Sequence, residues 1–127
     1  MCDTQLTTLF KVGEEVELDF SECKSGVKRT LQDGQEQYIS FPDGTESTEF
    51  DSNWLVSGSD EDSGSSVKVS IERAETYTLI TVTIPSVSLS DSGVYFADHE
   101  HEGQVYSKSY TVKVFEMDEE LEAAAGN

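Results

Sequence analysis

The stretch Asp91-Ser92-Gly93-Val94-Tyr95-Phe96-Ala97 is the most informative part of this chain. If it forms a strand, Tyr95 and Ala97 point to one face of a sheet. Val94 and Phe96 then point to the opposite face. Apolar residues precede the stretch at the spacing of a buried strand and its exit: Ile80, Val82, Ile84 and Val87. The two stretches predict consecutive strands joined by a short corner near Asp91.

A matching strand is expected near the N-terminus. After a turn at Gly13-Glu14, the residues alternate in polarity and place Val16, Leu18 and Phe20 on one face. Further stretches rich in Val, Thr, Ile and Tyr, such as 67–71 and 110–114, are separated by clusters of Gly, Asp and Ser. A chain of 127 residues with this pattern is long enough for one all-β domain with a core between two sheets.

Residues 91–97 resemble the Asp-x-Gly-x-Tyr-x-Cys signature of immunoglobulin domains, and the resemblance extends over roughly residues 5–115. It implies an immunoglobulin-like two-sheet antiparallel sandwich, in which the hydroxyl of Tyr95 bonds back to the backbone near Leu89 or Asp91. Both cysteines of the usual inter-sheet disulfide are missing, and Phe20 and Ala97 stand in their places. We expect this apolar pair to substitute for the disulfide in the core.

The long separation between Phe20 and Ala97 favours the variable-type layout, in which strands C′ and C″ extend the sheet of strands G, F and C. Turns at Asp33-Gly34 and at 42–44 leave two assignments open. Either 27–32 is strand C and 36–41 is C′, or 36–41 is strand C itself. We prefer the first assignment, with C″ drawn from 48–50 and 54–56. Lys68 stands where variable-type domains carry an arginine, so we expect it to pair with Asp91.

The tryptophan that such domains carry on strand C is absent, and Leu31 or Ser40 stands in its place. We expect Trp54, the only tryptophan, to cover a sheet edge or to lie under the acidic loop around residues 60–62. The only cysteines are Cys2 and Cys23. If the chain folds back on itself at Gly13-Glu14, the two lie close together. A non-standard disulfide between them and a pair of reduced thiols both remain open.

Charge and motif content exclude several functions. The formal net charge of −18, with only eight Lys and Arg, argues against a nucleic-acid or anionic-membrane partner. The run Asp60-Glu61-Asp62 lacks the spacing of a calcium loop. His99 and His101 share one side of a strand, but no third metal ligand accompanies them. No motif ties a nucleophile to either histidine. We therefore expect no enzyme, no metal and no cofactor.

The chain is thus expected to work through its surface, and this step is an analogy with the family. We expect residues 1–115 to form a protein-recognition domain and 116–127 an acidic tail or linker. The parent protein would be a cell-surface adhesion or self-recognition receptor, similar to invertebrate allorecognition receptors and binding through its G-F-C-C′ face. The alternative is a cytoplasmic scaffold module of the muscle type. The candidate contact residues are Val94, Phe96, Asp98, Val105, Ser107, Lys28, Arg29 and Tyr38.

Overall fold

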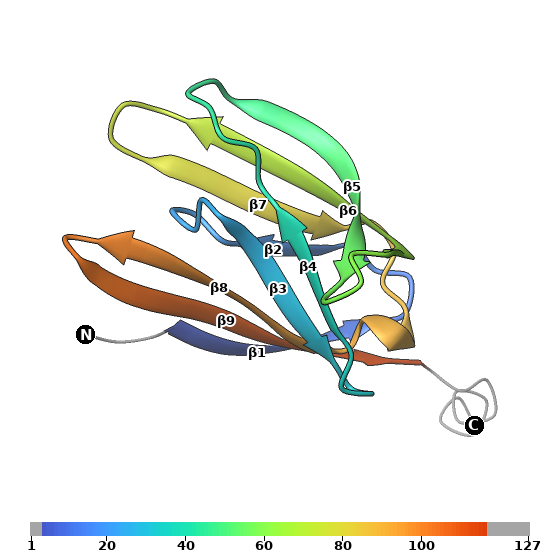
Figure 1. Cartoon of the computed structure of the whole chain (residues 1–127). Coiled ribbons are helices and arrows are strands. Elements are labelled where there is room, and N and C mark those ends of the chain that lie inside the picture. The colour runs from blue at the N-terminus through green and yellow to red at the C-terminus, as the bar shows by residue number, and fades with distance from the viewer. Residues whose placement is uncertain (1–3, 117–127) are drawn as a thin grey trace.

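The computed structural model describes residues 4–116, which form a two-layer arrangement of strands (Figure 1). The elements are β1 (Thr4–Lys11), β2 (Val16–Asp19), β3 (Gly26–Leu31), β4 (Glu36–Ser40), β5 (Thr48–Val56), β6 (Asp62–Arg73), β7 (Thr78–Ile84), the single-turn 3₁₀ helix η1 (Leu89–Asp91), β8 (Gly93–His101) and β9 (Gln104–Phe115). Hydrogen bonds join the strands in the order β1-β9-β8-β3-β4-β5-β6-β7-β2. The predicted all-β sandwich is confirmed.

Two strands, β4 and β5, lie between β3 and β6. Strand β3 pairs with β8 on one side and with β4 on the other, so the preferred assignment of 27–32 beside the strand that carries Tyr95 is correct. The alternative assignment, with 36–41 in that place, is wrong. Strand β5 joins the two layers, because Thr48–Asn53 runs along β6 while Leu55 and Val56 pair with β4.

Strand β1 does not fold back on β2, so that expectation is wrong. It pairs in parallel with β9 in the other layer, from Thr4 opposite Lys108 to Lys11 opposite Phe115. The chain crosses between layers at Gly13, whose φ of 94° suits glycine. There the N–H of Gly13 donates to the carbonyl of Val87 at 2.8 Å. Local hairpin reasoning fails here because the partner of β1 is the last strand of the chain.

The pairing of β1 also removes the argument that placed Cys2 beside Cys23. Cys23 is a buried free thiol, and burial raises its pKa to about 11. Cys2 lies outside the described residues, so a bridge between the two stays a prediction without its geometric basis.

The core contains the residues that alternation placed there. Val16, Leu18 and Phe20 are buried, as are the inward residues of β7. Phe20 packs its ring edge-on against Tyr110, with ring centroids 5.3 Å apart. Ala97 belongs to the same buried cluster. That the pair of Phe20 and Ala97 replaces a disulfide energetically stays a prediction.

Trp54 lies in the middle of the core and has no exposed surface, so the expectation of an edge position is wrong. On β5, Phe50 and Ser52 lie opposite the buried Val69 and Val67 of β6, so the two-residue period that places them inward also turns Trp54 inward. Leu31 and Ser40 do not take the place of the missing strand-C tryptophan: Leu31 is half-buried and Ser40 is exposed. The buried tryptophan of the core is instead Trp54 on β5.

Arg29 is the most buried charged residue in the described chain, with 1% of its surface exposed. Its Nη1 donates to Asp91 Oδ1 at 2.9 Å and to Tyr95 Oη at 2.8 Å, and its Nε donates to Gln37 at 2.7 Å. Its guanidinium lies 4.4 Å from the centroid of the Trp54 ring. A buried cation needs such partners, since an unpaired one is very costly to desolvate.

Asp91 therefore pairs with Arg29, and the expected pair of Asp91 with Lys68 is wrong. Lys68 lies between Val67 and Val69 on β6, so the strand alternation turns its side chain outward. There it pairs with Glu49 at 2.7 Å, and both side chains are about half exposed. The hydroxyl of Tyr95 donates to the carbonyl oxygen of Asp91 at 2.5 Å, which closes the corner between β7 and β8.

The substitution Phe20→Ala tests the core. It should lower the free energy of unfolding by about 3–5 kcal/mol, because it removes a buried ring and leaves a cavity. Urea titration of both proteins measures the change. The matched control is Phe115→Ala, which truncates an exposed phenylalanine and should cost less than about 1 kcal/mol. A loss below about 1 kcal/mol for Phe20→Ala as well would contradict the assigned core.

The substitution Tyr95→Phe tests the corner. It should cost about 1–3 kcal/mol near pH 7, because the Asp91 carbonyl loses its donor and Arg29 loses an acceptor. Burial raises the pKa of Tyr95 from its usual 10.0 to about 12. The contribution of Tyr95 is therefore complete below pH 10.0 and is lost as the pH rises toward about 12.

The stability gap between the native chain and Tyr95→Phe should accordingly shrink when urea titrations are repeated between pH 9 and about 11.5. Tyr77→Phe, at an exposed tyrosine, should show no gap at any of these pH values. A neutral Tyr95→Phe, or a gap that does not change with pH, would refute the role of this hydroxyl.

Candidate functional site

The outer face of the layer that contains β9, β8, β3 and β4 is hereafter called the front face. One row of outward side chains crosses all four strands. Phe96 lies opposite Ser109 on β9 and opposite Lys28 on β3, and Lys28 in turn lies opposite Tyr38 on β4. The row follows from strand alternation, since Tyr95 and Ala97 occupy the inner face of the same strand.

A shallow hollow of about 160 Å³ opens on this row. Its polar and aromatic lining comes from Ser25, Lys28, Tyr38, Ser40, Phe96 and Asp98. The hollow's floor depends on Gly26, where a Cβ would come within 2.2 Å of the carbonyl oxygen of Ile39. Glycine therefore lets β3 and β4 approach closely under the hollow.

Polar contacts hold two sides of the hollow in place. Tyr38 donates its hydroxyl to Asp60 Oδ1 at 2.6 Å, and this hydrogen bond raises the pKa of Tyr38. On the opposite side, Ser107 donates to Asp98 Oδ1 at 2.7 Å. The hollow is thus rimmed by an ammonium, a phenol and a carboxylate around the half-buried ring of Phe96, which suits contact with a mixed polar and apolar surface.

The structure brings most of the predicted contact residues together on the front face. Val94 and Val105 are outward, with 37% and 58% of their surfaces exposed. Arg29 is the exception, and its prediction as a rim residue is wrong, because it points into the core. Arg29 lies two residues from Val27 and from Leu31 on β3, and this spacing predicts an inward side chain. The charge of Arg29 suggested the surface instead.

The acidic loop and the histidines form no metal centre. Asp60 accepts the hydrogen bond of Tyr38, and Asp62 accepts from Asn53 and from the Gly64 N–H, which lower its pKa. His99 stacks on Tyr106, with centroids 5.1 Å apart. Within residues 4–116 no group of three or more His, Cys, Asp or Glu side chains is placed to hold a metal ion.

The outer face of the other layer, hereafter the back face, has a different character. Its exposed side chains on β2, β5 and β6 include the acids Glu17, Asp19, Glu49, Asp51 and Glu72. Lys68, paired with Glu49, is the cation among them. The front face also carries acids, at Glu36, Asp98 and Glu100, together with the cations Lys28 and Lys113. The back face is the more acidic of the two and therefore the less suitable for contact with another acidic protein.

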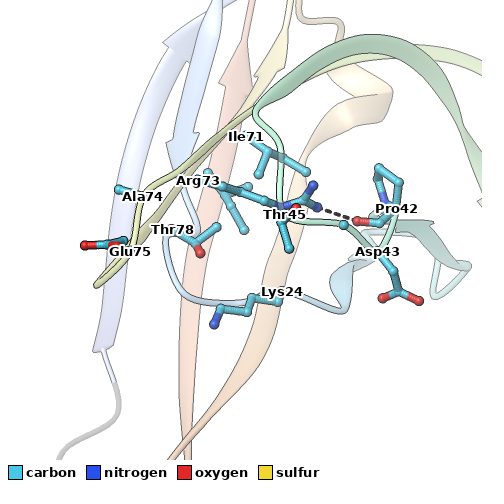
Figure 2. Close-up of a pocket in the computed structure, with 11 residues that line it drawn as sticks. Lys24, Pro42, Asp43, Thr45, Ile71, Arg73, Ala74, Glu75 and Thr78 are labelled. Carbon is cyan, nitrogen blue, oxygen red and sulfur yellow. Dashed lines mark hydrogen bonds between the residues drawn. The ribbon is translucent and has the colours of Figure 1, made fainter.

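A larger groove of about 560 Å³ lies at the loop end of the sandwich (Figure 2). Arg73 in its wall is hydrogen-bonded to the loop between β4 and β5. Its Nη1 donates to the Glu46 carbonyl and its Nη2 donates to the Pro42 carbonyl. Lys24 in the lining is accompanied by Asp43 and Glu75. The positive and negative charges in the lining of the groove are thus balanced. Of this groove, the sequence analysis had predicted only the turn at 42–44.

No family model matches the chain, and no curated protein matches its sequence. Among solved structures, the extracellular fragment of Novel Immune-Type Receptor 11 from Ictalurus punctatus, which includes the stalk region, is similar. Its TM-score is 0.54 at 15% identity, and the match covers 93% of this chain and 90% of that one.

Two further solved structures match with lower TM-scores. They are the second Ig domain of the mouse polymeric immunoglobulin receptor (0.48, 10% identity, 90% and 99% covered) and the BTLA ectodomain (0.44, 15% identity, 91% and 95% covered). At these identities the likeness concerns the fold alone. The chain has an immunoglobulin-like fold.

Proposed function

We propose that this chain is a variable-type immunoglobulin-like domain that recognises proteins through its front face, as part of a cell-surface adhesion or self-recognition receptor. The observation that carries the proposal is the contrast between the two outer faces. On the front face Phe96 and Tyr38 line a hollow and Val94 and Val105 are exposed elsewhere on the same face, whereas the back face is the more acidic. Exposed apolar surface with a polar rim is typical of protein contacts.

The strand order supports the variable-type part of the proposal. Strands β4 and β5 lie between the strand beside β8 and the strand beside β7, which is the order expected for C′ and C″ of a variable-type domain. In domains of this type the sheet that contains C′ is enlarged, which gives a broad face for partners. The similar fish protein is itself named an immune-type receptor and its solved fragment is extracellular. Both points favour a recognition role on a cell surface.

Contact also fits the site better than catalysis does. The hollow is shallow, its tyrosine and aspartate are engaged in hydrogen bonds, and its lining offers no nucleophile paired with a base. No helix among the described residues is long and apolar enough to cross a membrane. Because the hollow is shallow and its polar groups are engaged, we propose a protein surface as the partner, and a second copy of this chain is the first candidate.

The alternative is a cytoplasmic scaffold module. One observation favours it: Cys23 is a buried free thiol, and the positions of the usual inter-sheet bridge hold Phe20 and Ala97. Thiols without disulfides are typical of reducing compartments. The presence of both β4 and β5 counts against this alternative, because muscle scaffold modules have a shorter type of immunoglobulin domain that lacks the pair of strands C′ and C″.

The substitution Phe96→Asp tests the proposal. Beads that carry the native chain should cluster through front faces, and beads that carry Phe96→Asp should cluster much less, because the new carboxylate meets an identical charge across the contact. The matched control is Leu79→Asp, which places the same charge at an exposed leucine of β7, outside the front face. Circular dichroism checks that all three proteins stay folded.

Clustering of the native beads should increase with added salt, because two molecules of charge −18 repel each other and ions screen that repulsion. Equal clustering by folded Phe96→Asp and the native chain would overturn the assignment of the front face. Native beads that never cluster at any salt concentration would overturn the second copy as partner.

A further inference from the structure

Among residues 4–116 the sandwich has two edge strands, β1 and β2, and of these only β2 is protected. Strand β2 has four residues and carries the exposed acids Glu17 and Asp19. The N–H of Asp19 donates to Tyr110 Oη at 3.3 Å, and this hydroxyl donates to the Asp19 carbonyl at 3.0 Å. This edge is short, carries charged side chains and has backbone groups already bonded to Tyr110, so it resists pairing with other strands.

Strand β1 has none of these protections. It is eight residues long, and residues 4–10 carry no charge in a chain of which 27% is charged. The segment also lacks proline. Leu6 and Leu9 leave 47% and 66% of their surfaces exposed. A long, uncharged edge with exposed leucines is the kind of edge that pairs with another strand.

The backbone of β1 shows which groups face outward. In a parallel pair, every second residue of a strand bonds to the partner strand. The N–H of Val12 donates to the Phe115 carbonyl at 2.9 Å, so the bonded residues are the even-numbered ones. The N–H and C=O of residues 5, 7 and 9 on β1 therefore point to the free edge. Lys11 ends this set, because both of its backbone groups bond to Glu14.

We propose that β1 of one molecule pairs antiparallel with β1 of a second copy, with Thr7 opposite Thr7 of the other copy. This register places position 5 opposite Leu9, so every outward backbone group of the free edge finds a partner. It joins the two front-face layers into one continuous sheet. The pairing is symmetric, as in most two-fold dimers.

Charge at the edge favours a copy of this chain as the occupant. Lys11 is exposed at the end of β1, and Lys113 lies opposite Leu9 on β9, so two of the eight cations flank the edge. A second copy therefore meets no acid along residues 4–10, so this edge is a place where two acidic molecules can approach. The free backbone groups at residues 5, 7 and 9 are also symmetric about Thr7, which makes the edge complementary to itself. This side-by-side contact lies beyond the front face and does not depend on it.

Disulfide trapping tests the register. Thr7→Cys in a Cys2→Ser background should form a covalent dimer with oxidised glutathione, because Cα atoms of a hydrogen-bonded antiparallel pair lie about 5.5 Å apart, within disulfide range. The controls are Thr8→Cys, one residue along the strand, and Ser70→Cys, exposed on the back face. Dimer formation by Thr7→Cys at the rate of either control would refute the proposal.

Sedimentation velocity in the Phe96→Asp background, in which the front-face contact is blocked, tests the edge without new thiols. Leu9→Pro removes an outward N–H that β9 does not use, and should weaken dimerisation by at least about tenfold. Leu9→Ala keeps the N–H and should weaken it far less. Equal dimerisation by folded Leu9→Pro and Leu9→Ala would overturn backbone pairing. Phe96→Asp should leave Thr7→Cys trapping unchanged, so failure of the edge and failure of the front face are distinguishable.

Discussion

The buried guanidinium of Arg29 is the group on which the arrangement of this domain depends. It lies under the ring of Trp54 and bonds to Asp91, Tyr95 and Gln37, so it links β3, β4, β5, β8 and η1. A buried ion pair of this kind gains little over an apolar core, but removing one partner is costly because the other charge stays buried. Where immunoglobulin domains commonly have a disulfide, the described residues of this chain have Phe20 and Ala97 in the core and this network.

The sequence predicted the fold where local alternation carries the information. Val16, Leu18 and Phe20, the inward residues of β7 and the corner at Tyr95 all lie where a two-residue period placed them. It failed where the answer was set by distant contacts. Trp54 is inward because 48–56 forms one long strand along β6, and β1 pairs with β9 rather than with its neighbour in the sequence. Arg29 had the right parity for the core, but its charge suggested the surface, because lone arginines are rarely buried.

The candidate site followed from the same alternation, which is why most of its residues share one face. Once Tyr95 is fixed in the core, Val94, Phe96 and Asp98 have to point outward. The hollow beside them was not predictable, since it depends on the close approach of β3 and β4 at Gly26 and on the bond from Tyr38 to Asp60. The unequal charge of the two faces likewise appears only when β2, β5 and β6 are placed in one layer. A net charge far from zero favours solubility, whereas the distribution of that charge determines which surface an acidic protein can approach more easily.

The most direct test of this account is a double-mutant cycle on Arg29 and Asp91, measured by urea unfolding at pH 7. Arg29→Met and Asp91→Asn should each cost about 3–5 kcal/mol, because each leaves the other group buried without its partner. The double variant should cost less than the sum of the two, with a coupling energy of at least about 1.5 kcal/mol. Additive costs, equal to the sum within about 0.5 kcal/mol, would show that the pair does not act as a unit and would contradict its central place in the fold.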